Sequence, residues 1–369
     1  MTIPFIDLAA QFAAIEPDVR TRMDRVLAHG QFIMGPEVAE MEAALAEFVG
    51  EGRECISCAS GTEALLIALM ALGIGPGDEV ITTPFTFVAT GEMIALLGAT
   101  PVFVDVRLED ANIDERLIEA AITARTKAII PVSLYGQPSD MVAIERIADA
   151  HGLTVIEDAA QSFGAEQGGV RSCGLSRLAT TSFFPSKPLG CYGDGGAIFT
   201  SDPELAQAMR EIRVHGQSKR YVHTRIGVGG RMDTLQCAVV LAKMTRFGEE
   251  LDLRAEVAQR YCDGLSGLDP ALRLIEVATD RTSVWAQYTV RVTDRDGLAA
   301  ALQAEGIPTA VHYPVPLNDQ PAYRDLARGG ATPNARVLAG TVMSLPMSAD
   351  LSMQDQMRII ATIKRTLQS

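Results

Sequence analysis

Between residues 60 and 200 the sequence alternates between two hydrophobic periods, and this alternation constrains the fold more than any other feature. Short runs of β-branched and aromatic residues predict buried strands, and apolar residues recur at helical spacing between them. Apolar strands that alternate with helices are typical of a parallel sheet covered on both faces, so we expect an α/β fold with a mostly parallel sheet. The expected strands are 79–83, 101–106, 127–134, 153–156, 180–184 and 197–200, and the expected helices are 64–72 and 140–150.

After Asp233 the pattern changes. Residues 234–265 predict one long helix that is charged on one face, and shorter pieces follow it. A chain of 369 residues is long enough for two domains. We therefore expect a large domain over residues 1–247 and a smaller C-terminal α+β domain over residues 248–369. In the smaller domain the expected strands are 284–292 and 309–312, and the expected helices are 298–305 and 351–367.

The composition excludes several classes of protein. Lys and Arg number 32 against 46 Asp and Glu, and the resulting net charge of −14 disfavours binding to nucleic acid or to anionic lipid. Six cysteines, mostly in apolar or Gly-rich surroundings, suit reduced thiols in a cytosol. The start of the chain lacks the basic segment of an export signal, and the longest apolar run, 64–72, is too short to cross a bilayer. We expect a cytoplasmic protein that binds neither nucleic acid nor membrane.

Lysine is scarce in this chain, and Lys187 has the most unusual surroundings. It lies between Pro185 and Pro188, shortly after a predicted strand and after Phe183 and Phe184. An ammonium group in a rigid apolar loop is partly desolvated, which lowers its pKa and frees the amine for Schiff-base chemistry. The alternative is an ordinary surface lysine in a Pro-rich turn.

Asp158 follows the predicted strand 153–156, at the carboxyl end where open α/β sheets bind ligands. A carboxylate there can keep a heterocyclic nitrogen protonated, as pyridoxal phosphate requires, or it can simply cap the next helix. Gly61 and Thr62 follow Ser60 at the start of a predicted helix. The free N–H groups of this helix start suit a bound phosphate. The alternative is that Ser60 is an ordinary N-cap. Phe87 follows another strand, where an aromatic ring either stacks on a cofactor or fills the core.

The segment 210–231 is basic within an acidic chain, with six Lys and Arg residues against one acid, Glu211. Such a segment suits a small anionic ligand, such as a nucleotide diphosphate or a carboxylate, or it is a solvated loop. The sequence predicts no metal site. It has a single CxxC, at Cys55 and Cys58, and its histidines lack the spacing of metal ligands. The chain has no G-x-S-x-G, no GxGxxG and no P-loop, so a serine hydrolase, a dinucleotide site and an ATP site have no support.

Three segments in a fixed order resemble the DegT/StrS family of nucleotide-sugar aminotransferases. They are IEDAAQSFGA at 156–165, SFFPSKPLG at 182–190 and GDGG at 193–196, and the resemblance extends from Gly35 to the final helix. The family consists of pyridoxal-phosphate enzymes with the aspartate-aminotransferase fold. The resemblance therefore implies this fold, this cofactor and a homodimer whose active site is shared between subunits.

The resemblance also implies a role for individual residues toward the cofactor. Lys187 would bind it covalently, Asp158 would pair with the pyridine nitrogen, and Gln161 would contact the ring hydroxyl. Phe87 would stack on the ring. One position departs from the family, because Gly229 stands where an Asn usually reaches the cofactor phosphate of the neighbouring subunit. This departure predicts weaker cofactor retention unless a backbone N–H or a water substitutes. The phosphate itself would be bound by Gly61, Thr62 and Ser182.

Within the family, segments 186–192 and 309–314 resemble the 3-aminotransferases that act on UDP-2-acetamido-2-deoxy-3-oxo-glucuronate. Arg231, His312 and Tyr313 would then come from the partner subunit and face the sugar, and a uronate carboxylate would give Arg231 a charge-assisted partner. The implied reaction moves an amino group from L-glutamate to the 3-keto carbon of this nucleotide sugar. Its product would serve the synthesis of surface polysaccharide, the O-antigen of lipopolysaccharide.

Several alternatives stay open. The same chemistry suits a dTDP-linked 3-oxo sugar or a 4-oxo sugar. A sugar 3-dehydratase shares the fold, but those members carry histidine in place of the Schiff-base lysine, so Lys187 argues against it. A non-catalytic regulator or sugar-binding module is the remaining class, and the set of Lys187, Asp158 and Gln161 argues against it. Fold alone does not decide among these functions.

Overall fold

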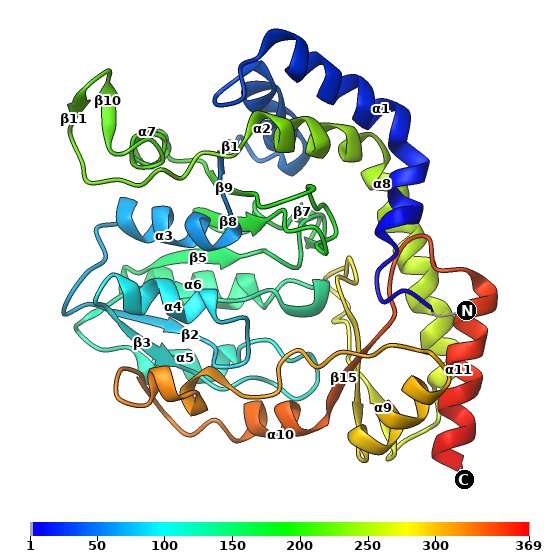
Figure 1. The fold of residues 1–369 in the computed structure, drawn as a ribbon. Coiled ribbons are helices and arrows are strands. Elements are labelled where there is room, and N and C mark those ends of the chain that lie inside the picture. Colours follow the sequence, from blue (N-terminus) through cyan, green and yellow to red (C-terminus); the bar gives the residue numbers. More distant parts are fainter. Residues whose placement is uncertain (1–2, 369) are drawn as a thin grey trace.

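The computed structural model describes residues 3–368, which form a large sheet with helices on both faces beside a smaller sheet (Figure 1). The large sheet has eight strands in the order β1-β9-β8-β5-β4-β2-β3-β14. Every neighbouring pair from β8 to β14 is parallel, and β9 runs antiparallel to both β8 and β1. The predicted α/β fold with a mostly parallel sheet is therefore confirmed. The strands are β1 (Glu54–Cys58), β2 (Glu79–Thr82), β3 (Thr100–Phe103), β4 (Thr126–Ile130), β5 (Thr154–Asp158), β8 (Leu178–Ser182), β9 (Gly196–Thr200) and β14 (Arg328–Gly329).

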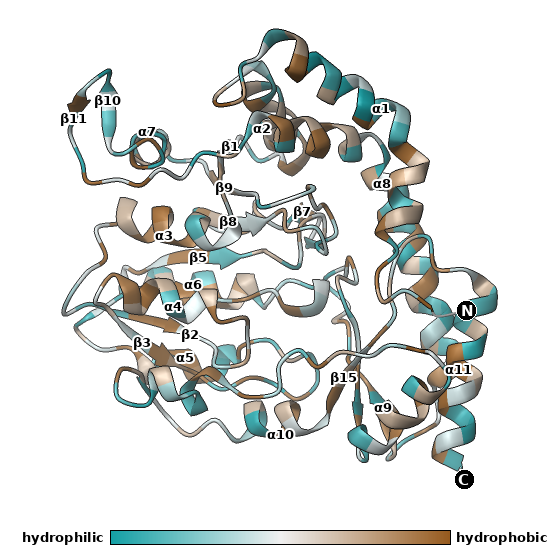
Figure 2. Cartoon of the chain, in the orientation of Figure 1, coloured by the Kyte–Doolittle hydropathy of each residue, from teal (hydrophilic) through white to brown (hydrophobic). Residues whose placement is uncertain are grey.

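Burial of the sheet on both faces explains why its strands are apolar throughout. Successive side chains of a strand point to opposite faces, so β5 contributes Ile156 to one core and Val155 to another. The first core is closed by α3, α4 and α7, and the second by α5 and α6. Helix α3 is coloured as hydrophobic over most of its length in Figure 2, as expected for a helix packed within the core. These helices are α3 (Gly61–Ala71), α4 (Ala89–Leu96), α5 (Ile118–Ala121), α6 (Met141–His151) and α7 (Pro203–Ile212).

A third core lies on the other side of β8 and β9. There Ala179 and Phe199 pack against α1 (Leu8–His29), α2 (Pro36–Val49) and the first half of α8 (Thr234–Leu265). Helix α8 begins and ends where the sequence predicts. The sequence pattern did not identify α1 and α2.

The second half of α8 packs on the smaller sheet. Val257 and Tyr261 belong to the core of that sheet, which is antiparallel and has the order β12-β13-β15. The division at residue 247 falls inside α8 and stays a prediction. No helix within residues 3–368 is apolar over a length that would cross a bilayer. The remaining elements are β6 (Glu166–Gln167), β7 (Val170–Arg171), β10 (Gln217–Lys219), β11 (Val222–His223), β12 (Leu272–Leu274), β13 (Tyr288–Val292), α9 (Arg295–Ala304), α10 (Pro333–Thr341), β15 (Val342–Leu345) and α11 (Met353–Gln368).

The predicted strand at 309–312 was wrong. Only Ala310 pairs there, in an isolated bridge to Ser344 of β15. Pro308 and Pro314 flank the segment, and proline lacks the N–H group that a strand ladder needs. The chain therefore leaves the small sheet after one bridge and continues toward the carboxyl edge of the large sheet.

Candidate active site

A cavity of about 470 Å³ opens at the carboxyl edge of the large sheet. The ends of β5 and β8 meet there, because parallel strands finish at the same edge. Nine of the ten site residues that the sequence predicts line this one cavity. They are Gly61, Thr62, Phe87, Asp158, Gln161, Ser182, Lys187, His312 and Tyr313.

The start of α3 forms an anion cradle at one end of the cavity. The Ser60 hydroxyl caps the helix by accepting from the Glu63 N–H at 3.1 Å. Within residues 3–368, the N–H groups of Gly61 and Thr62 have no hydrogen-bond partner, so they remain available to a ligand. A Cβ on Gly61 would lie 2.6 Å from the Cβ of Ser182, so only glycine lets the helix start this close to β8.

Asp158 lies at the end of β5, buried at the floor of the cavity. Its Oδ2 accepts from the Thr90 hydroxyl at 2.9 Å, and its Oδ1 accepts from the Ala160 N–H at 3.2 Å. Burial raises the pKa of Asp158, while these two hydrogen bonds and the nearby ammonium of Lys187 oppose the rise. The carboxylate is thus held in one orientation, with polar partners that favour its ionised form.

Lys187 lies in the loop after β8, where its backbone N–H donates to the Phe184 carbonyl at 2.8 Å. The residue is half-buried, and it borders the cavity. Its pKa is lowered by this desolvation, and the charge of Asp158 opposes the change. The predicted desolvated environment of this lysine is therefore present in the fold.

Gln161 has its side-chain orientation set by two partners. The carboxamide oxygen accepts from the Tyr135 N–H at 2.9 Å, and the amide nitrogen donates to the Tyr313 hydroxyl at 3.2 Å. A bound cofactor would therefore meet an N–H donor here, which suits the ring oxygen that the sequence analysis assigned to Gln161. Phe87 lines the same cavity, and 54% of its surface is exposed. The centroid of its ring lies 6.4 Å from the centroid of the Tyr313 ring.

His312 and Tyr313 correct one expectation from sequence, because they line the pocket of their own chain rather than the pocket of a partner. The Tyr135 hydroxyl donates to the His312 carbonyl and holds this segment over the edge of its own sheet. The His312 ring lies with Nδ1 at 2.9 Å from the Ser344 hydroxyl. Burial and the Lys187 charge lower the pKa of His312 to about 4, so the ring is neutral at pH 7.

Arg231 is the one predicted site residue that does not line the cavity. It lies beside Gly229, where an added Cβ would be 3.1 Å from the His215 ring and 3.8 Å from the Arg231 guanidinium. Elsewhere in the basic segment, Arg213 is buried against Glu42, so its charge is structural. The β10–β11 hairpin carries Lys219 and Arg220 and stands away from the large sheet in Figure 1.

Several polar residues of the cavity carried no expectation from sequence, among them Thr90 and Gln287. Thr90 contacts Asp158, and Gln287 borders the cavity next to β13. A lone amide within the apolar run 284–292 was the available signal for Gln287. The sequence around Thr90 gave no comparable signal, because its hydrogen bond to Asp158 joins residues that are 68 positions apart.

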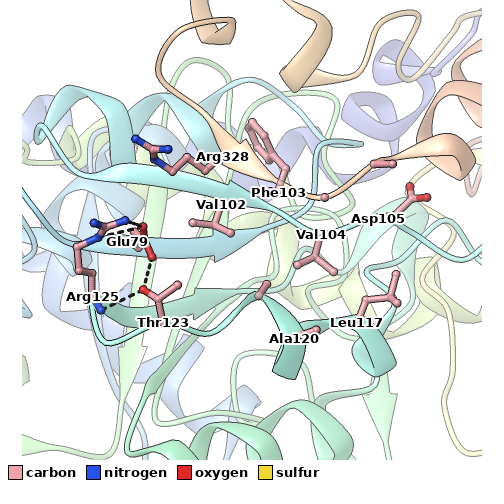
Figure 3. A pocket seen from close by; sticks show the side chains of 14 residues that line it. Glu79, Val102, Phe103, Val104, Asp105, Leu117, Ala120, Thr123, Arg125 and Arg328 are labelled. Atoms are coloured by element: carbon pink, nitrogen blue, oxygen red, sulfur yellow. Dashed lines mark hydrogen bonds and ion pairs between the residues drawn. The ribbon is translucent and has the colours of Figure 1, made fainter.

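A second cavity of about 430 Å³ lies beside β3 and β14, the last two strands in the order of the sheet, and is also bordered by α5 (Figure 3). None of the predicted site residues borders it. Its buried carboxylate, Glu79, is paired with Arg125 and hydrogen-bonded by Thr123. Among the described residues, no group of three or more His, Cys, Asp and Glu side chains could hold a metal ion. Cys55 and Cys58 are buried free thiols in β1.

An α/β sheet that brings a desolvated lysine, a buried carboxylate and a phosphate cradle to one edge defines a pyridoxal-phosphate enzyme of the aspartate-aminotransferase fold. The sequence model of the DegT/DnrJ/EryC1/StrS aminotransferase family matches residues 14–364. The chain belongs to this family.

Known relatives share nearly its full length. A Pseudomonas aeruginosa UDP-2-acetamido-2-deoxy-3-oxo-D-glucuronate aminotransferase is 58% identical over 94% of this chain and 95% of that protein. A pleiotropic regulatory protein of Geobacillus stearothermophilus is 43% identical over 98% of each chain. The crystal structure of Bacillus subtilis ntda with bound cofactor PMP matches with a TM-score of 0.92 and 31% identity, covering 100% of this chain and 86% of that one. The expected cofactor, pyridoxal phosphate, is thereby confirmed.

Proposed function

We propose that the chain transfers an amino group from L-glutamate to the 3-keto carbon of UDP-2-acetamido-2-deoxy-3-oxo-glucuronate, for O-antigen synthesis. The convergence of nine predicted site residues on one cavity carries the proposal of aminotransfer. The sugar is proposed from the similarity to the Pseudomonas aeruginosa enzyme. A dTDP-linked 3-oxo sugar and a 4-oxo sugar are the competing substrates.

Different residues of the cavity have different roles in the proposed reaction. Pyridoxal phosphate, when bound, supplies an electron sink for the charge that develops on the substrate carbon. The lowered pKa of Lys187 favours its neutral amine, which would take a proton from the α-carbon of the amino donor and return it to the aldehyde-derived carbon of the cofactor. Asp158, held by Thr90, keeps the ring nitrogen protonated. The N–H groups of Gly61 and Thr62 hold the phosphate.

We also propose that the enzyme works as a homodimer and that Arg231 enters the partner's cavity. Three neighbouring apolar residues, Phe32, Ile33 and Met34, are between 43% and 51% exposed, which suits a covered interface. Ile33 pairs with Asp233, so this apolar surface adjoins Arg231. The Arg231 guanidinium lies outside the cavity of its own chain and beside the proposed interface. This position suits contact with a ligand in the partner's cavity. Sedimentation velocity of the holoenzyme tests the dimer, and a monomer would overturn the proposal.

A half-reaction run backwards tests the substrate. The pyridoxal form is mixed with UDP-2-acetamido-3-amino-2,3-dideoxy-glucuronate, and the visible absorbance of the cofactor is followed. Loss of the visible band, with appearance of the pyridoxamine form, is the expected result. A sample that responds to L-glutamate but not to this sugar would discard the sugar and keep the aminotransferase. A sample that responds to neither would favour a regulator.

A further inference from the structure

Gln287 borders the same cavity as His312 and Tyr313. Its backbone N–H donates to the Tyr135 carbonyl at 3.4 Å, which fixes the start of β13 against the cavity wall. Tyr135 also contacts Gln161 and the His312 carbonyl, so one residue places all three at the same end of the site. This end is the one where the sugar ring is expected.

The Gln287 carboxamide has unused hydrogen-bonding capacity. Its buried Oε1 has no hydrogen-bond partner within residues 3–368. By contrast, Asp158 is bonded by Thr90 and Gln161 by Tyr135. A buried polar atom without a partner is unfavourable, and leucine or methionine would fill a similar volume without that penalty. The amide therefore does not stabilise the substrate-free enzyme. Its presence at this position suits a hydrogen bond to a bound substrate.

We propose that Gln287 is a specificity-determining residue that hydrogen-bonds the acetamido group next to the reacting keto carbon. This inference rests on the proposed function. A carboxamide presents N–H donors and a carbonyl acceptor side by side, and the acetamido group presents the matching pair. A carboxylate would complement only the donors and would leave the orphaned oxygen without a partner. In this structure that oxygen is buried, so the proposal requires the carboxamide to turn over on binding, which would exchange the positions of its oxygen and nitrogen.

The test compares two amino sugars in the backward half-reaction, the 2-acetamido compound and its 2-hydroxy analogue. We expect the wild type to prefer the acetamido sugar and Gln287→Leu to lose about 10- to 100-fold of that preference. The half-reaction with L-glutamate should lose less of its rate than the half-reaction with the acetamido sugar, and it serves as the reference for the comparison. The melting temperature of the substrate-free protein should stay the same or rise, because an unsatisfied polar atom is removed. Gln287→Met provides a second variant with an unbranched side chain.

Gln137→Leu is the matched control. Its carboxamide is buried and bonded to the Glu276 carbonyl and the Ala278 N–H. This variant should melt at a lower temperature and keep the sugar preference. If both Gln287 variants keep the preference, or lose the glutamate reaction equally, the inference is overturned while the proposed function stands. If the wild type reacts with L-glutamate but not with the acetamido sugar, the inference and the proposed sugar are both overturned, and the aminotransferase is kept.

Discussion

Gly61→Ala is the substitution whose effect follows most directly from the geometry of the site. The new Cβ would lie 2.6 Å from the Cβ of Ser182, where carbon atoms in contact prefer about 3.5–4.0 Å. Ser182 is held in β8 opposite Gly196 and cannot move aside freely. The start of α3 must therefore shift by about 1 Å, and the N–H groups of Gly61 and Thr62 shift with it.

The expected magnitude combines two opposed effects. Overpacking of this kind costs about 1–3 kcal/mol, and replacing glycine by alanine in a helix returns up to about 1 kcal/mol. For a chain of 369 residues, a net loss of about 1–2 kcal/mol corresponds to a melting temperature lower by about 1–3 °C. Displacing one hydrogen bond to the charged phosphate weakens cofactor binding by about 10- to 100-fold.

Gly248→Ala is the matched control, because Gly248 lies inside α8 with no atom within 4 Å of an added Cβ. It should stabilise the fold by up to about 1 kcal/mol and leave the cofactor affinity unchanged. Thermal unfolding followed by circular dichroism gives the stability, and titration of the apoprotein with pyridoxal phosphate gives the affinity. If Gly61→Ala matches the wild type in both measurements, the phosphate cradle is wrongly assigned.

Three further substitutions test other parts of the site. Lys187→Ala should abolish turnover in a coupled glutamate assay, and retained turnover would contradict its role as the base. Asp158→Asn should fold, as judged by circular dichroism, yet turn over far more slowly, and an unchanged rate would remove Asp158 from the chemistry. The lowered pKa of His312, about 4 against 6.5 unfolded, means that the unfolded chain binds a proton that the native protein does not. Stability from this residue is full above pH 6.5 and decreases by about 3 kcal/mol as the pH falls toward 4. His312→Gln should flatten this dependence in urea unfolding, and an unchanged slope would refute the buried neutral ring.

Local patterns in the sequence were enough for the large sheet and for most of the cofactor site. Alternating apolar periods predicted six of its eight strands, all but β1 and β14, because burial on both faces demands apolar side chains at every position. Asp158 and Lys187 follow predicted strands directly, and parallel strands must end at one edge. The small unit was predicted less well, since the segment at 309–312 is apolar enough for a strand but makes a single bridge.

The sequence by itself thus determined the α/β sheet and the chemistry of the cofactor, and it indicated the residues near strand ends that we propose to serve the cofactor. Only the tertiary structure decided which distant residues complete the site. Gln161 meets Tyr313 across 152 positions, and the Tyr135 hydroxyl meets the His312 carbonyl across 177, which places that segment in its own chain's cavity. Such contacts depend on how the two sheets pack, and no local pattern along the chain encodes that packing. For the same reason the unpartnered amide of Gln287 becomes visible only in the folded molecule.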